Sequence, residues 1–158
     1  MNAEDIISKL EMLPHPEGGY YKETYRSEEQ TINKEGNKRN TSTAIYFLLE
    51  NNNISRFHRI KSDELWFFHQ GEPIEIVSIQ NNKLVSTILG NNLENDEVPQ
   101  AVIPANVWFA SSVKDGSGFG LVSCTVAPGF DFADFEMAKQ DELLEEYPML
   151  ESVIKKYT

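Results

Sequence analysis

The stretch SRFHRIKSDELWFFHQGEP, residues 55–73, holds two of the three histidines of the chain, His58 and His69. Glu64 lies six residues after His58, and Gly71 lies seven residues after Glu64. An imidazole and a carboxylate at this spacing suit either coordination of a metal ion or transfer of a proton. A third interpretation is structural: His58 and Glu64 form a buried, hydrogen-bonded pair in the wall of a β-barrel.

Strand alternation suggests which side chains accompany this pair. Side chains in a strand point alternately to its two faces, so Arg56 shares a face with His58, and Glu64 comes off the next strand. We expect these three to converge inside a barrel as catalytic residues (His58, Glu64) and a ligand-binding residue (Arg56). An arginine fork suits a carboxylate or phosphate. Trp66 and Phe109 are expected to wall the same pocket, with ordinary core packing as the alternative.

The other two histidines have open roles. His15 lies between Pro14 and Pro16. It belongs either to an arm that reaches over a barrel mouth or to a rigid turn that leads into a strand. His69 lies an odd number of residues from Glu64, so it faces away from the pocket unless a bulge reverses it.

The elements that must position these residues are mostly strands. A short helix is expected at the N-terminus, capped by Asn2 and carrying Ile6, Ile7, Leu10 and Leu13. A strand over GGYYKETYR follows, and residues 28–41 are expected to form an exposed loop. Short strand-like runs separated by turns occupy residues 43 to about 126. They are TAIYFLLE, ISRFHRI, DELWFFH, PIEIVSIQ, KLVSTILG, QAVIP, VWFASS and GFGLVSCTVA.

Two helical segments, DELLEEY and PMLESVIKKY, end the chain, and Pro148 suits a helix start. The whole pattern predicts one all-β domain over residues 1–158, a barrel with a short helix in front and helices behind. Small barrels of this kind hold ligands in their mouths.

The amino-acid composition argues against some classes of binding partner. The 158 residues include 14 Lys+Arg and 25 Asp+Glu, a formal net charge of −11. This excess of acid argues against nucleic acid and against an anionic membrane surface. The single cysteine, Cys124, forms no intrachain disulfide and is expected to be a buried thiol. The acidic N-terminus does not look like a signal peptide, and no apolar run approaches the ~20 residues of a membrane helix. A cytoplasmic protein is expected.

Four blocks in order resemble one known family. HPEGGYYKETYRS, SRFHRIKSDELWFF, PQAVIPANVW and CTVAPGFDFADFE together resemble the Cupin-5 family, also called DUF985, of the RmlC-like cupin superfamily. The resemblance covers nearly all of residues 5 to 150. It implies a double-stranded β-helix (jelly-roll) barrel, commonly a homodimer, with a biochemical role that is largely unassigned.

The sequence departs from the cupin motifs at positions that usually supply metal ligands. A metal-binding cupin typically uses three histidines and one glutamate, and the resemblance places His58 and Glu64 at two of these positions. Ile60 and Phe109 stand at the other two, and neither side chain coordinates a metal. We therefore expect no metal and no cofactor, with weak metal binding through His58 and Glu64 as the alternative. Asn106, where the motif prefers glycine, is expected to adopt the left-handed turn.

The sequence thus predicts a cupin-family protein with a small-molecule-binding barrel pocket and an unassigned role. The alternative is a metal-independent isomerase or epimerase of the sugar type, with His58 as base and Glu64 orienting it. The ligand is expected to be anionic and sugar-like, because of Arg56 and the aromatic residues. A homodimer is expected to form through the arm around EGGYYKETYR.

Overall fold

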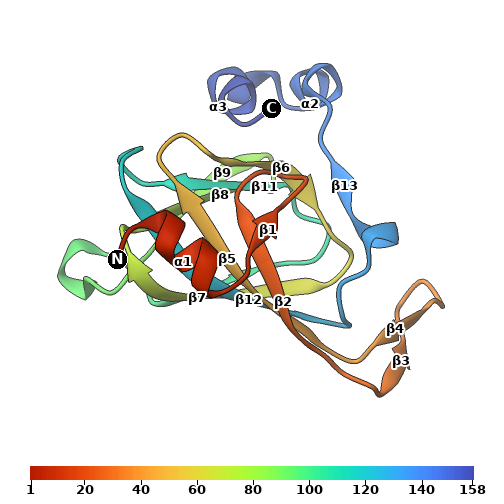
Figure 1. The fold of residues 1–158 in the computed structure, drawn as a ribbon. Coiled ribbons are helices and arrows are strands. Elements are labelled where there is room, and N and C mark those ends of the chain that lie inside the picture. Colours follow the sequence, from red (N-terminus) through yellow and green to blue (C-terminus); the bar gives the residue numbers. More distant parts are fainter.

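Two antiparallel β-sheets face each other and hold the main core between them (Figure 1). The computed structural model describes residues 1–158. One sheet has the strand order β1-β2-β5-β12-β7-β10 and the other has the order β13-β6-β11-β8-β9. The expected all-β, double-stranded β-helix fold class is confirmed, although the strands pair within two sheets rather than around a closed ring.

The six-stranded sheet consists of β1 (Leu13–Pro14), β2 (Tyr20–Arg26), β5 (Thr43–Glu50), β12 (Phe119–Ala127), β7 (Asp63–Gly71) and β10 (Gln100–Ile103). The five-stranded sheet consists of β13 (Glu136–Met137), β6 (Ser55–Arg59), β11 (Phe109–Val113), β8 (Ile74–Gln80) and β9 (Lys83–Leu89). The helices are α1 (Ala3–Lys9), α2 (Gln140–Glu146) and α3 (Glu151–Lys156), with 3₁₀ turns η1 (Leu93–Asn95), η2 (Phe132–Asp134) and η3 (Pro148–Leu150).

The N-terminal helix begins as expected but ends early. Asn2 Oδ1 accepts a hydrogen bond from the Asp5 N–H at 2.9 Å, and the Asp5 carboxylate accepts one from the Asn2 N–H at 3.1 Å. This reciprocal pair is a capping box. The helix ends at Lys9, and Leu13 lies in β1 with 61% of its surface exposed. The prediction that Leu13 belongs to the apolar face of the helix is wrong.

Residues 28–41 are not an irregular loop. They form a hairpin of β3 (Gln30–Ile32) and β4 (Lys38–Asn40), which projects from the body of the molecule (Figure 1). The Asn33 side chain accepts hydrogen bonds from the N–H groups of Glu35 and Asn37, and this closes the turn. Strands of three residues are too short to show a periodicity in the sequence.

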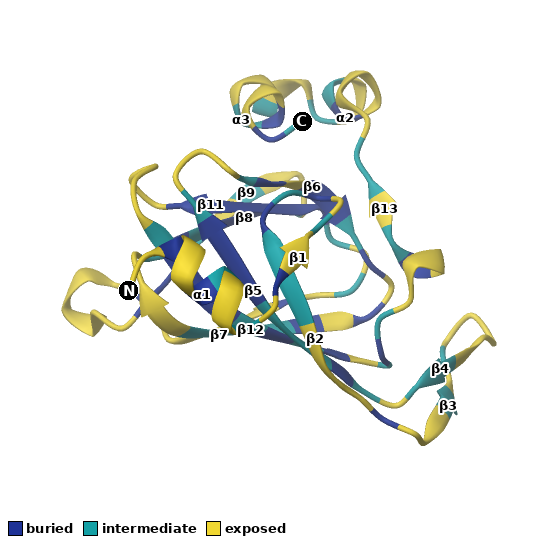
Figure 2. Cartoon of the chain, in the orientation of Figure 1, coloured by how far each residue is buried: buried dark blue, intermediate teal, exposed yellow.

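Three apolar clusters hold the layers together. Figure 2 shows that the buried residues lie mostly in the strands of the two sheets. The largest cluster fills the space between the sheets and includes Phe47, Trp66 and Phe109. A second lies where α2 and α3 cover the outer face of the five-stranded sheet, and α1 covers part of the other outer face. Burial of such apolar surface supplies about 25 cal/mol per Å². None of the helices has the length and apolar character needed to cross a membrane.

Candidate functional site

A cavity of about 430 Å³ lies at one end of the space between the sheets. Strands β2, β5, β7 and β12 supply one wall, β6 supplies His58, and two segments outside the sheets complete it. These segments are the loop of residues 15–19 and the strap, as we call residues 128–135. The lining residues are His15, Glu17, Tyr21, Glu23, Arg26, Thr43, Ile45, His58, Ile60, Glu64, Cys124, Val126, Phe130, Asp131, Phe132 and Phe135.

His58 is buried at the base of this cavity, and both of its ring nitrogens have partners. Nδ1 lies 2.8 Å from the carbonyl oxygen of Arg56, which only accepts hydrogen bonds, so Nδ1 carries a proton. Nε2 lies 2.7 Å from Oε2 of Glu17. With Glu17 ionised, His58 is an imidazolium that donates from both nitrogens. The direct partner of His58 is therefore Glu17, which the sequence did not suggest, rather than Glu64.

The loop of residues 15–19 places Glu17 inside the protein. The His15 N–H donates to the Gly19 carbonyl at 2.9 Å, and the Gly18 N–H donates to the His15 carbonyl at 3.0 Å. Gly18 has φ +111°, and a Cβ there would overlap the carbonyl oxygen of Ile54, so only glycine fits. The Arg56 N–H donates to the Glu17 carbonyl at 2.9 Å and ties the loop to β6.

The Glu17–His58 pair is electrostatically matched. Burial alone would lower the pKa of His58, but the charge of Glu17 and the hydrogen bond to it reverse this, and the pKa of His58 is raised. Burial alone would raise the pKa of Glu17, but the charge and hydrogen bond of His58 lower it. The contact therefore favours the charged form of both groups.

Glu64 is a second buried carboxyl of the cavity, and it has no cationic partner. Its Oε1 accepts a hydrogen bond from the indole N–H of Trp66 at 2.9 Å. Burial, and then the negative charge of Glu17, raise the pKa of Glu64 to about 7. Burial and the same carboxylates raise the pKa of the adjacent Cys124 thiol. Glu64 is thus the group poised to exchange a proton near neutral pH.

His15 also lines the cavity, through the loop that carries Glu17. Its Nδ1 accepts a hydrogen bond from the Glu17 N–H at 3.2 Å, so the proton of the neutral ring is on Nε2. Burial lowers the pKa of His15, which favours the neutral form. The sequence left two roles open for His15, an arm over a barrel mouth or a rigid turn. The segment is a rigid turn, and it also forms part of the cavity wall.

The expectation that Arg56 faces the pocket is wrong, because β6 contains a bulge. His58 pairs with Phe109 of β11, and Ser55 pairs with Ser111, so three steps along β6 match two along β11. The extra residue breaks the alternation that linked Arg56 to His58. The Arg56 side chain is exposed and donates to the Pro16 carbonyl at 3.2 Å. Arg56 holds the loop and does not line the cavity.

Trp66 and Phe109 belong to the core behind the cavity rather than to its walls. Each is 1% exposed, and neither lines the cavity. The Phe109 ring lies 4.2 Å, centroid to centroid, from that of His58, so it supports the buried imidazole. His69 is exposed, bonds Ser123 at 2.7 Å and lies outside the cavity.

Comparisons with known proteins identify the family. Residues 4–138 match the family described as Cupin superfamily (DUF985). The chain belongs to this cupin family. The uncharacterized protein YML079W of Saccharomyces cerevisiae is 34% identical over 157 residues, which cover 90% of this chain and 78% of the yeast protein.

Solved structures agree with this assignment. A hypothetical protein from Leishmania major is 40% identical with a TM-score of 0.95, covering 100% of this chain and 99% of that one. Protein SO0799 from Shewanella oneidensis is 40% identical with a TM-score of 0.92, covering 100% and 98%. Oxalate decarboxylase from Bacillus subtilis, at 12% identity and a TM-score of 0.60, shares the fold; the match covers 96% of this chain and 38% of that one.

The residues of this cupin do not fit the metal site that the motifs imply. Ile60 lines the cavity and Phe109 packs on His58, and neither carries a donor atom. Both nitrogens of His58 are already engaged. No group of three or more His, Cys, Asp or Glu side chains is arranged to hold a metal ion. Asn106 adopts the expected left-handed conformation, with φ +63°.

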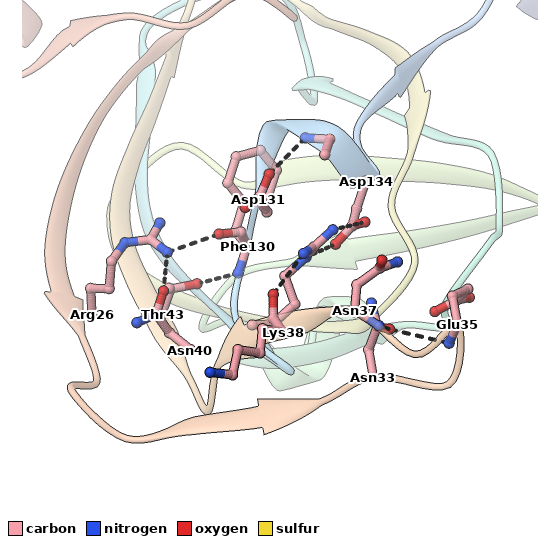
Figure 3. A network of polar contacts seen from close by, with 12 residues as sticks. Arg26, Asn33, Glu35, Asn37, Lys38, Asn40, Thr43, Phe130, Asp131 and Asp134 are labelled. Carbon is pink, nitrogen blue, oxygen red and sulfur yellow. Dashed lines mark hydrogen bonds and ion pairs between the residues drawn. The ribbon is translucent and has the colours of Figure 1, made fainter.

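The strap closes one side of the cavity and is pinned by polar contacts (Figure 3). Arg26 donates to the Phe130 carbonyl at 3.0 Å, and the Phe130 N–H donates to the Thr43 hydroxyl at 2.9 Å. Arg39 of the projecting hairpin forms two 2.8 Å hydrogen bonds to the carboxylate of Asp134, whose side chain is 7% exposed. The Arg39 guanidinium lowers the pKa of Asp134. The hairpin thus serves to hold the cavity wall.

The Asp134→Asn substitution is expected to lower the free energy of unfolding by more than the control substitution described below, because it removes the carboxylate that accepts two hydrogen bonds from the Arg39 guanidinium and so holds the strap. It should also speed hydrogen exchange across the strap. Glu136→Gln is the matched control, since the Glu136–Arg59 pair is more exposed, at 56% and 36%, and is expected to contribute less than about 1 kcal/mol. Urea unfolding with hydrogen exchange makes the comparison, and equal effects of the two substitutions would contradict it.

Proposed function

We propose that the cavity binds a small organic molecule and that the carboxyl of Glu64 exchanges a proton with it. The observation that carries this proposal is a buried carboxyl without an ion-pair partner on the wall of a cavity of about 430 Å³. Burial and the nearby Glu17 raise the pKa of this carboxyl to about 7. A general acid or base works best when its pKa is near the working pH. A purely structural carboxyl gains nothing from such a value, because its burial destabilises the fold.

The geometry favours Glu64 over His58 as the base. Neither ring nitrogen of His58 has a lone pair free toward the cavity, since one meets the Arg56 carbonyl and the other meets Glu17. In this proposal His58 and Glu17 are positioning residues that fix the local field, and Glu64 is the group that touches the ligand. This reverses the roles that spacing alone suggested. His15, with its proton on Nε2, is the neutral donor available for a developing oxyanion.

The reaction class that suits this set is a metal-independent isomerisation or epimerisation. Glu64 removes a proton from a carbon next to a carbonyl, the electrons move to the carbonyl oxygen, and His15 donates a hydrogen bond to that oxygen. Return of the proton to another face or carbon completes the reaction and regenerates the carboxylate. The chemistry needs no redox partner.

A thermal-shift screen of small carbonyl compounds, polyols and amines at pH 7 identifies binders. Each binder is then incubated in deuterated water and analysed by mass spectrometry. Wild-type protein is expected to introduce deuterium, and Glu64→Gln is expected to slow this by about 100-fold or more. Glu97→Gln, a buried glutamate outside the cavity, is the control. Binding without deuterium incorporation would assign the protein as a binding module, and unchanged exchange in Glu64→Gln would remove Glu64 from the mechanism.

We also infer a homodimer that forms along β2. Strand β1 covers only Tyr20 and Tyr21 of β2, so residues 22–26 of β2 have no strand partner on that side within the chain. Unpaired edges invite pairing with another chain. Tyr25 on this strand is 56% exposed, whereas Tyr20 and Tyr21 are half-buried, so one tyrosine rather than three supports the interface. Light scattering should give twice the 18.0 kDa chain mass, and a value equal to the chain mass at micromolar concentration would contradict the dimer.

A further inference from the structure

We propose that the ligand of this cavity is an organic cation, with an ammonium group beside Glu64 and an apolar or aromatic body against the rings of the strap. This inference rests on the proposed function, because it names the ligand class of the same cavity. The observations are the charge balance of the walls, the isolation of Glu64 and the aromatic lining.

The charges of the cavity walls do not balance. Four carboxylates line the cavity, but Arg26 and His58 are the only cationic side chains there, because His15 favours its neutral form. Both cations are already paired, His58 with Glu17 at 2.7 Å and Arg26 with Glu23 at 2.6 Å. The remaining carboxylates, Glu64 and Asp131, form no ion pair. An anionic ligand would therefore meet a negative excess, and Arg56, on which that expectation rested, lies outside the cavity.

Glu64 is the carboxyl that most needs a cation. It is 8% exposed, and the polar group that bonds it, the Trp66 indole, is neutral. A buried carboxylate without a counterion is strongly disfavoured. A ligand ammonium supplies the missing charge and makes a charge-assisted hydrogen bond, the stronger kind.

The cavity is also lined by aromatic side chains. Tyr21, Phe130, Phe132 and Phe135 line the cavity, and Phe132 is 53% exposed. The Phe130 and Phe132 ring centroids lie 4.9 Å apart at an interplanar angle of 81°, so the two rings present different faces. Aromatic faces attract cations and pack against apolar ligand bodies. Carboxylate and aromatic groups together thus select an amine over a carboxylate of the same size.

The test uses three probes of matched size: benzylammonium, benzyl alcohol and benzoate. Isothermal titration calorimetry at pH 6.5 is run in two buffers that differ in ionisation enthalpy. Benzylammonium is expected to bind at least about tenfold more tightly than benzyl alcohol. Its binding should release most of one proton per site, because the cation makes Glu64 ionise. Glu17, His58 and Cys124 also lie near Glu64. The contact between Glu17 and His58 favours the charged form of each, and burial raises the pKa of the Cys124 thiol.

The Glu64→Gln variant separates the outcomes. It is expected to weaken the binding of benzylammonium by about tenfold or more and to abolish the proton release, and to change the binding of benzyl alcohol much less. Glu97→Gln should change none of these. Equal or tighter binding of benzyl alcohol or benzoate would overturn the cation inference while leaving the cavity as a small-molecule site. Failure of all three probes would overturn the inference alone, whereas an empty thermal-shift screen would reject the proposed function as well.

Discussion

Replacing Glu17 by Gln is expected to lower the free energy of unfolding near pH 6 by about 3 kcal/mol, because it removes the counterion of a buried imidazolium. His58 is 3% exposed and 2.7 Å from Glu17. Without the carboxylate, burial is the dominant influence, and the pKa of His58 should fall below its ordinary value. Glu23→Gln is the control, since its ion pair with Arg26 is exposed, at 41% and 37%, and such pairs contribute less than about 1 kcal/mol.

The pH dependence of this loss has a definite sign. The folded pKa of Glu17 lies below its unfolded value, so its contribution is present above the unfolded pKa of 4.5 and is lost on acidification. The folded pKa of His58 lies above its unfolded value of 6.5, so its contribution is complete below that pH and declines as pH rises. The difference between wild type and Glu17→Gln should therefore peak between pH 4.5 and 6.5. Urea unfolding at several pH values measures it, and a difference that grows above pH 7 would contradict this assignment.

Replacing Glu64 by Gln is expected to stabilise the protein at pH 8 by about 3 kcal/mol and to change its stability little near pH 4.5. The pKa of this carboxyl is about 7 in the folded protein and 4.5 as its ordinary value. The folded state therefore binds more protons than the unfolded state between these values, and stability falls as pH rises through that window. Glutamine keeps an oxygen that accepts from the Trp66 indole, so the hydrogen bond is retained.

A gain of stability on replacing a buried polar residue is the mark of a group kept for function. Chemical unfolding at pH 5 and pH 8 measures the gain. Glu97→Gln, also buried but outside the cavity, controls for the general effect of neutralising a buried acid. A Glu64→Gln protein that is less stable than wild type at pH 8 would mean that the carboxylate has a partner and a structural role.

The strands that the sequence predicted best are those with long, bounded apolar runs. TAIYFLLE forms β5 from Thr43 to Glu50, and the block around DELWFFH forms β7. The alternation that placed Glu64 inside held because its strand is regular there. The same argument failed for Arg56, because a single-residue bulge in β6 shifts the facing and leaves no clear trace in a sequence.

The spacing of residues along the sequence could not predict that Glu17 contacts His58. Glu17 lies 41 residues before His58 in the sequence, and a loop rather than a strand carries it. The available signal was a glutamate beside Gly18-Gly19, where a turn with positive φ brings the backbone close to another strand. Such a turn shows that the chain is bent there, but not what the bend packs against.

The proposed function requires that Glu64 titrate near neutral pH inside the cavity. The most direct measurement follows the carboxyl ¹³C resonances of glutamate-labelled protein as a function of pH, with Glu64→Gln used to assign the signal. One resonance, absent from the variant, is expected to titrate with a pKa of about 7. A Glu64 resonance that titrates at or below 4.5, the ordinary value, would contradict the proposed role and the ligand class inferred from it.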